Sequence, residues 1–238
     1  MLKSTNLIEF FKDIIIPPVC SVCGNINSEL LCTECKLKIV KIDGNICKYC
    51  GRSISGYERG TSAADKSSTD SKICSLCRKE NFNFYRLRSF ALYKGVVRKI
   101  IHKYKYQKLY NLKKILVEFL KQVYNKYYRS EKIDYIETVP GDHMHILCSE
   151  FSTAVSIPFI SNIIKIKKTP RQQTLNLYQR KNNLKGAFKV RSNLLVSGKN
   201  ILLIDDIWTT GSTLDEISLV LKNSNVDKIY LLTIAKGM

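Results

Sequence analysis

The sequence predicts an α/β domain with a mainly parallel sheet, preceded by a small cysteine-rich module. Eight of the nine cysteines fall into four Cys-x-x-Cys pairs within the first 77 residues. From about residue 85, short apolar stretches alternate with segments whose apolar residues recur at helical spacing. One apolar stretch, 200–204, is almost continuous, as expected for a strand that is buried on both faces of a parallel sheet.

Composition restricts the class of protein. The chain has 238 residues, of which 45% are hydrophobic and 25% charged, which argues against wholesale disorder. No apolar run reaches about 18 residues, which excludes a membrane-spanning helix. Glu9, Lys12 and Asp13 interrupt the apolar N-terminal stretch and no small-residue cleavage site follows, so we do not expect a signal peptide. We expect a cytoplasmic protein, either free or peripheral to the inner face of the membrane.

The formal net charge is +19, from 39 basic and 20 acidic residues. Such an excess favours polyanions, phosphorylated ligands or acidic membrane surfaces as partners. Fourteen lysine or arginine residues lie in the tyrosine-rich segment 86–132, and nine more lie in 165–191. Basic residues interleaved with aromatic rings suit single-stranded nucleic acid, whose phosphates attract charge and whose bases stack on rings. The solvated faces of amphipathic helices explain the same pattern equally well.

The N-terminal segment predicts one helix. Apolar residues between 7 and 15 lie at helical spacing, and Pro17-Pro18 ends the helix. We expect this helix to pack against the body of the protein, with a membrane-surface anchor as the alternative. Residues 51–73 are rich in Ser, Gly, Asp and Lys and predict a flexible insert. The expected division is an N-terminal module over residues 1–80 and an α/β domain over residues 85–238.

The four Cys-x-x-Cys pairs predict two structural Zn²⁺ sites, because tetrahedral Zn²⁺ takes four thiolates and each pair supplies two from one tight turn. Gly24 and Gly51 follow the first and third pairs, where the turn needs a residue that tolerates positive φ. This alternation favours two sequential sites over an interleaved cross-brace. The predicted ligands are Cys20, Cys23, Cys32 and Cys35 in one site, and Cys47, Cys50, Cys74 and Cys77 in the other.

Other roles for the cysteines are disfavoured. A reducing cytoplasm and the strict two-residue spacing argue against a disulfide framework. A redox-active pair normally stands alone at the start of a helix, which these four pairs do not. The ninth cysteine, Cys148, is expected to be a small buried hydrophobic residue.

The second half of the chain predicts strands and helices in alternation. The expected strands are 88–93, 135–139, 200–204 and 228–235. Apolar residues at helical spacing predict helices over 96–101 and 112–127, and another after residue 213 that carries Leu214, Ile217 and Leu221. Strands that alternate with helices over about 150 residues are typical of doubly wound α/β domains.

The segment 201–213, ILLIDDIWTTGST, carries the clearest chemical signal. A buried strand delivers Asp205 and Asp206 to the carboxyl edge of the sheet, and the chain then turns into a helix. Glycine and hydroxyl residues at a helix N-terminus form a cradle for phosphate, because several N–H donors converge there. Adjacent carboxylates suit ribose hydroxyls and tolerate Mg²⁺. The alternative is a strand end followed by an ordinary capped turn.

The strand, acidic pair and hydroxyl-rich turn resemble the phosphoribosyl pyrophosphate (PRPP) signature of type I phosphoribosyltransferases. The chain as a whole resembles the ComF family, which is associated with natural competence and DNA uptake. The resemblance rests on four segments in the family's order, 10–23, 90–106, 169–188 and 201–213. It implies a type I phosphoribosyltransferase-like domain after a double zinc ribbon. It also implies binding of PRPP with Mg²⁺, and handling of single-stranded DNA.

The resemblance also implies roles for individual residues. Asp205 and Asp206 would hold the ribose hydroxyls directly or through Mg²⁺, and would be the catalytic pair. The 5′-phosphate would lie on the turn formed by Thr209, Thr210, Gly211, Ser212 and Thr213. Val139, Pro140 and Gly141 would lie beside the pyrophosphate. Residues 167–185 would form a mobile hood, with Arg171, Arg180 and Lys185 as candidates for neutralising the pyrophosphate. Trp208 would either stack on a ligand or pack against the sheet.

The sequence departs from the family's pattern at 138–151, where the pyrophosphate loop is expected but its arginines are missing. His143 and His145 occupy this segment and are expected to be exposed loop residues, with a metal or proton-transfer role as the alternative. Two alternative functions therefore stand beside the competence role. One is an active phosphoribosyltransferase with an unknown acceptor. The other is a non-catalytic PRPP sensor whose ribbons bind a protein such as a helicase or an uptake channel.

Overall fold

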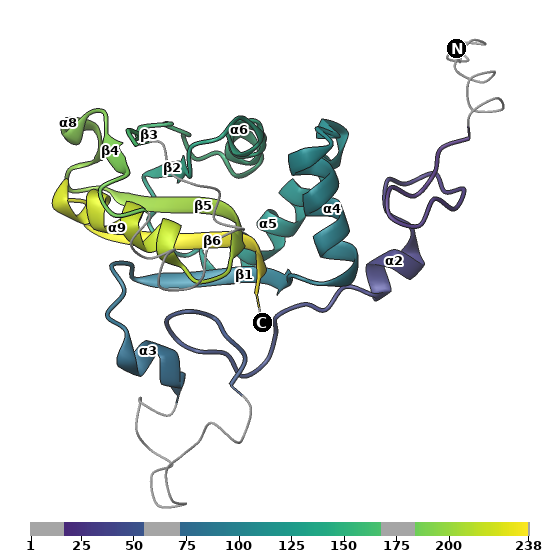
Figure 1. Cartoon of the computed structure of the whole chain (residues 1–238), viewed down its shortest axis with the longest axis horizontal. Helices are drawn as coiled ribbons and strands as arrows, with labels where there is room; N and C mark the ends of the chain where they lie inside the picture. Colours follow the sequence, from purple (N-terminus) through teal and green to yellow (C-terminus); the bar gives the residue numbers. More distant parts are fainter. Residues whose placement is uncertain (1–16, 55–71, 168–183, 238) are drawn as a thin grey trace, which may run out of the picture.

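The computed structural model describes residues 17–54, 72–167 and 184–237, and its centre is a four-stranded parallel sheet (Figure 1). The strand order is β1-β6-β5-β2. Every predicted strand is present, which confirms the predicted α/β class, although β5 runs four residues beyond the predicted end at 204. The strands are β1 (Arg86–Leu92), β2 (Tyr135–Thr138), β5 (Asn200–Trp208) and β6 (Lys228–Lys236).

Helices cover both faces of the sheet. Leu202 and Ile204 of β5 pack with the helices that connect β1 to β2 and with the helix after β2. Ile201 and Leu203 alternate with them and pack against α9, the helix between β5 and β6. None of the helices in the described ranges is long and apolar enough to cross a membrane. The helices that cover the sheet are α4 (Gly95–Tyr106), the short η3 (Tyr110–Leu112), α5 (Lys113–Tyr127), α6 (Asp142–Val155) and α9 (Ser212–Asn223).

A second, two-stranded sheet lies on the α9 side of the molecule. It pairs β3 (Ile163–Lys165) antiparallel with β4 (Phe188–Val190), and the short helix α8 (Asn193–Val196) follows. The segment predicted to be the hood joins these two strands. Its residues 168–183, with Arg171 and Arg180, lie outside the described residues.

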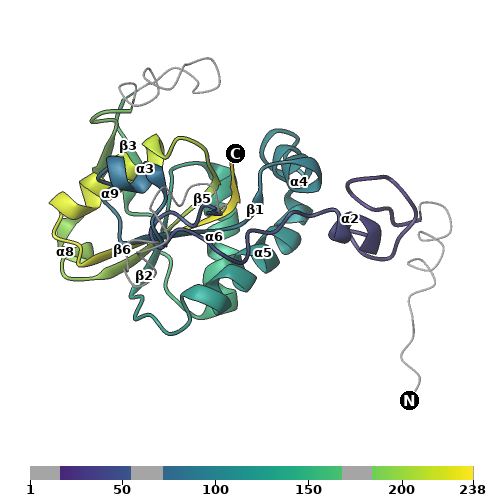
Figure 2. The ribbon, with the colours of Figure 1, turned by 90° about the horizontal axis from the view of Figure 1, so that it is seen from below.

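The cysteine-rich part of the chain forms two small modules at different places. The first contains α2 (Thr33–Leu37) and lies beyond α4 at one end of the molecule, whereas the second contains α3 (Ser75–Lys79) and lies against the sheet domain (Figures 1 and 2). The predicted N-terminal helix lies outside the described residues, as do residues 55–71 of the predicted insert. Residues 51–54 are ordered, because Ser53 bridges to Ile46 and Ile54 is buried, so the prediction of a flexible insert was wrong for them.

The chain between the two modules protects the outer edge of β1. The Ile42 N–H donates to the Phe90 carbonyl at 3.0 Å, and the Leu92 N–H donates to the Val40 carbonyl at 2.9 Å. An exposed edge strand presents unpaired backbone groups to other chains, so this antiparallel contact completes the sheet. It also fixes the cysteine-rich region to the α/β domain.

The segment 138–151 differs from the expected loop. The loop is confined to 139–141, and α6 begins at Asp142. Met144, Leu147, Cys148 and Phe151 recur at helical spacing and are buried, which gives the helix its apolar face. Cys148 is the buried residue that the sequence predicts.

Candidate functional site

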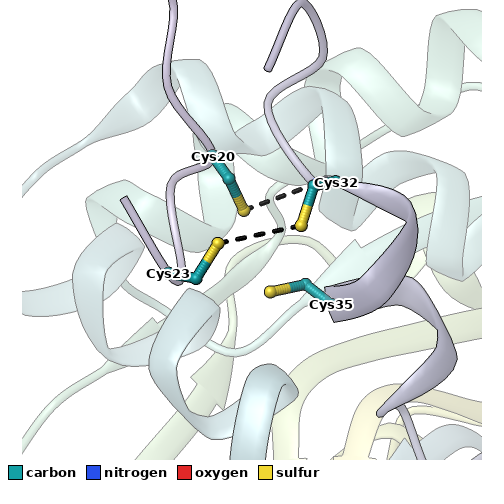
Figure 3. Close-up of side chains that lie close together, drawn as sticks. All are labelled: Cys20, Cys23, Cys32 and Cys35. Carbon is teal, nitrogen blue, oxygen red and sulfur yellow. Dashed lines mark hydrogen bonds between the residues drawn. The ribbon is translucent and has the colours of Figure 1, made fainter. Parts of the chain in front are cut away.

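The eight paired cysteines form two tetracysteine sites. The ligand atoms of Cys20, Cys23, Cys32 and Cys35 lie within 4.8 Å of one another (Figure 3), and so do those of Cys47, Cys50, Cys74 and Cys77. This grouping confirms the sequential pairing and excludes the cross-brace. Four sulfurs about 2.3 Å from a central Zn²⁺ would lie about 3.8 Å apart. The Cys23–Cys32 and Cys50–Cys74 sulfurs are each 3.7 Å apart, so the donor geometry fits zinc.

The two sites are built in the same way. The Cys32 N–H donates to Cys20 Sγ at 3.4 Å, and the Cys74 N–H donates to Cys47 Sγ at the same distance. Such donors stabilise thiolates and suit a metal site. Gly24 and Gly51 have φ of 81° and 64°, as the turn after each first pair requires.

A cavity of about 590 Å³ lies at the carboxyl edge of the main sheet. Asp205, Asp206 and the whole turn 209–213 line it, together with Val139 and Pro140 from the end of β2. Parallel strands end at one edge, and Thr138 of β2 lies beside Ile204 of β5, so the two strand ends meet there. The cavity is also lined by Tyr93, Lys105 and Tyr106 on the α4 side, and by Lys165, Leu184 and Phe188 on the side of β3 and β4.

Of the residues predicted for the PRPP site that the structure describes, two do not line this cavity. Gly141 lies beneath the His143 ring, where an added Cβ would come within 3.3 Å of His143 Cε1. Lys185 is exposed, and its carbonyl accepts a hydrogen bond from Lys167 Nζ at 3.1 Å.

The turn between β5 and α9 depends on a glycine. Gly211 has φ of 83°, and an added Cβ would lie 2.4 Å from two ring atoms of Trp208. The Thr210 and Ser212 hydroxyl oxygens are 3.0 Å apart, and the Ser212 N–H points toward Thr210 Oγ1 at 3.4 Å. Thr209, Thr210, Ser212 and Thr213 line the cavity, and hydroxyl residues at the start of a helix are a suitable arrangement for an anion. Trp208 itself is buried in packing, with 1% of its surface exposed.

Comparison with known proteins agrees with both parts of the chain. Residues 11–78 match the double zinc ribbon domain, and residues 144–238 match the phosphoribosyl transferase domain. Competence protein F of Haemophilus influenzae is 24% identical over 221 residues, covering 87% of this chain and 96% of that protein. DNA utilization protein YhgH of Salmonella typhimurium is 27% identical over 213 residues, covering 81% and 91%. The chain is homologous to these two proteins over most of its length.

Among solved structures, adenine phosphoribosyltransferase from Saccharomyces cerevisiae overlaps 54% of this chain and 69% of its own, with a TM-score of 0.38 and 18% identity. The match to the zinc ribbon domain agrees with two structural zinc ions, one for each tetracysteine site.

The two acidic residues of the cavity have pKa values shifted in opposite directions. Asp206 Oδ2 lies 2.5 Å from Lys105 Nζ and 3.4 Å from His143 Nε2. Although burial opposes the charge, these contacts lower the pKa of Asp206 to about 2. Burial, followed by the negative charge of Asp206, raises the pKa of Asp205 well above its usual range. A divalent cation, or hydroxyl groups that donate hydrogen bonds, would stabilise the carboxylate of Asp205.

Lys105 and His143 both contact Asp206; sequence reasoning missed Lys105 and gave His143 a functional role only as the alternative. Lys105 belongs to a segment that we assigned to general basic charge, and nothing in its spacing indicates which way it points. His143 was expected to be an exposed loop residue, but it lies in the first turn of α6 with its side chain only 20% exposed. His145 lies on the same helix and is exposed, with its ring 5.0 Å from that of Phe159. The helical spacing of the apolar residues after 143 is the signal that could have placed both histidines.

Proposed function

We propose that the chain binds phosphoribosyl pyrophosphate together with Mg²⁺ in the cavity at the carboxyl edge of the sheet, and that it handles single-stranded DNA during DNA uptake. One observation carries the first half of this proposal. The carboxylates of Asp205 and Asp206 share one cavity with the Gly211 turn, so groups suited to ribose and to phosphate lie within reach of one ligand.

Each wall of the cavity would take a different part of the ligand. The turn 209–213 would bind the 5′-phosphate through its hydroxyls and N–H groups. Asp205 and Asp206 would bind the ribose hydroxyls, and bound Mg²⁺ would neutralise charge on the pyrophosphate. The family's arginines are missing after β2, but among the described residues Lys105 and Lys165 line the cavity from other elements and would face the pyrophosphate.

If the site is catalytic, displacement at C1 of the ribose passes through a state with oxocarbenium character. Positioning of the ligand and stabilisation of the departing negative charge would then supply most of the rate enhancement. The contacts of Asp206 with Lys105 and His143 would hold its carboxylate in one orientation, which favours positioning of the ligand.

The nucleic-acid half of the proposal is supported by the outer surface of α4. Lys94, Arg98, Lys99 and His102 are exposed on it, and Arg98, Lys99 and His102 line a shallow hollow. The names of the relatives, competence protein and DNA utilization protein, point to the same class of partner. Phosphates along a single strand would lie against these side chains.

A ³¹P NMR time course with PRPP, Mg²⁺ and the zinc-loaded protein tests the first half. We expect the PRPP resonances to shift or broaden, and the Asp205→Asn/Asp206→Asn variant to lose this effect while remaining folded. Asp227→Asn removes an exposed carboxylate elsewhere and is the control. New pyrophosphate signal in the presence of a base or another acceptor would identify an active transferase, whereas persistent shifted signals would identify a sensor. An unperturbed PRPP spectrum would contradict the proposal.

A further inference from the structure

The second tetracysteine site lies directly against the end of the sheet that carries the Gly211 turn. Lys236 ends β6 and is only 2% exposed. Its Nζ donates a hydrogen bond to the Cys50 carbonyl at 2.7 Å. The same ammonium lies 5.3 Å from the centre of the Trp208 ring. One buried cation therefore contacts both the zinc-ligand turn and the indole.

Trp208 contacts the Gly211 turn as well, and so connects Lys236 to it. Its Cη2 and Cζ2 atoms lie where a Cβ on Gly211 would come within 2.4 Å, so the turn rests on the indole. The Gly237 N–H donates to the Trp208 carbonyl at 2.7 Å and fixes the backbone of the same residue to the end of β6. A shift of the indole would move the Gly211 turn, because the two are in close contact and no empty space separates them.

The chain that leaves the second site makes an independent connection. Phe82 and Phe84 meet the Trp208 ring edge-on, with centroids 5.7 and 5.5 Å away. Between them, the Asn83 N–H donates to Asp215 Oδ1 at 2.9 Å, in the first turn of α9. Both ends of the Gly211 turn are thus tied to the segment that follows Cys77.

Electrostatics favours this docking when zinc is bound. Four thiolates around one Zn²⁺ carry a net negative charge, and Lys236 and Arg88 are buried cations beside the turn that supplies Cys47 and Cys50. Arg88 donates to the Lys48 carbonyl at 3.1 Å and also approaches the Cys47 and Tyr49 carbonyls. The first site contacts α4 instead, where Lys103 Nζ donates to the Ser21 carbonyl at 2.7 Å.

We propose that the second tetracysteine site positions the Gly211 turn through Lys236 and Trp208, so that zinc at this site, and not at the first, sets the affinity for PRPP. Lys236 is thereby a positioning residue, since it acts through Trp208. This inference rests on the proposed binding of PRPP, but the contact between the metal site and the turn can be measured without the ligand.

Trp208 is the only tryptophan of the chain, so tryptophan fluorescence reports on the surroundings of this one residue. We expect Lys236→Met to shift the Trp208 emission and to increase its quenching by acrylamide in the absence of PRPP. The same variant should bind PRPP with Mg²⁺ about tenfold more weakly by titration calorimetry. Lys236→Arg keeps a buried donor and cation and should restore much of both properties. Lys228→Met, at the exposed other end of β6, should change neither.

A second pair of variants tests the metal sites themselves. Cys77→Ser and Cys35→Ser remove equivalent ligands from the second and first sites, and zinc analysis should show loss of one ion in each. Only Cys77→Ser should change the Trp208 emission. If both folded variants leave the emission unchanged, or both change it equally, the inference is wrong. If the emission responds as expected but wild-type protein does not bind PRPP, the proposed function fails and the positioning of the turn stands.

Discussion

At the scale of single residues, Glu137 carries a pH dependence that the sequence does not reveal. Its carboxylate is fully buried in β2, where Oε1 accepts the Thr138 N–H at 2.8 Å and Oε2 accepts the Asn162 N–H at 2.5 Å. Burial outweighs these bonds and raises the pKa of Glu137 to about 7. The folded state therefore binds a proton that the unfolded chain releases near pH 4.5. The free energy of unfolding should then fall as the pH rises from about 4.5 to 7.

Between pH 4.5 and pH 7 the free energy of unfolding should fall by about 3 kcal/mol, from the shift of the Glu137 pKa. Urea unfolding at several pH values should show it, and Glu137→Gln should remove this part of the dependence. The amide has only one acceptor for two N–H groups, so the variant should also be less stable at pH 5 by about 1–3 kcal/mol. Glu118→Gln, an exposed residue on α5, should keep the wild-type pH profile. An unchanged profile in Glu137→Gln would mean that another group titrates.

At the scale of elements, the turn between β5 and α9 depends on the absence of a side chain at position 211. Gly211→Ala must adopt a left-handed φ and also displace the Trp208 ring. We expect the two effects together to destabilise the fold by about 2–4 kcal/mol and to abolish PRPP binding. Gly198→Ala is a matched control, because Gly198 also has positive φ, 67°, but an added Cβ would meet nothing within 4 Å. Urea unfolding of the two variants separates the destabilisation caused by the left-handed φ from that caused by displacing the Trp208 ring. Equal decreases in the free energy of unfolding would contradict the role given to Trp208.

Strands, helices and metal sites were predictable where the spacing of one kind of residue dominates the segment. The apolar run 200–204 and the alternation around it gave the parallel sheet, and the spacing of the cysteines gave both metal sites. Helix α6 was missed because its first residues were interpreted by analogy with a loop, although the apolar residues after 143 follow a helical period. Lys105 could not be placed in the cavity from sequence, because its partner Asp206 is 101 residues away and only the packing of α4 against the sheet brings them together.

At the scale of the whole molecule, the net charge is +19, and basic side chains lie on two surfaces with different expected roles. Lys105 and Lys165 face the cavity, where they would meet a small phosphorylated ligand. Arg98 and Lys99 face outward from α4, where a strand of nucleic acid could lie across them. The same element would therefore contribute to both parts of the proposed function, since its C-terminal end lines the cavity and its outer face carries the exposed basic residues.

Single-stranded DNA binding should accordingly be electrostatic and local to α4. We expect the affinity for a 5′-labelled oligo-dT, measured by fluorescence anisotropy, to fall as the salt concentration rises. A plot of log affinity against log salt concentration should be linear, with a slope of about −0.7 for each phosphate contacted. Arg98→Ala/Lys99→Ala should reduce that slope by about 1.4, since two phosphate contacts are lost. Lys222→Ala/Lys228→Ala removes the same charge from exposed residues at the end of α9 and the start of β6, and should leave the slope unchanged. A flat salt response would mean that the excess charge does not bind phosphates. Equal effects of the two double variants would mean that binding depends on net charge rather than on the surface of α4.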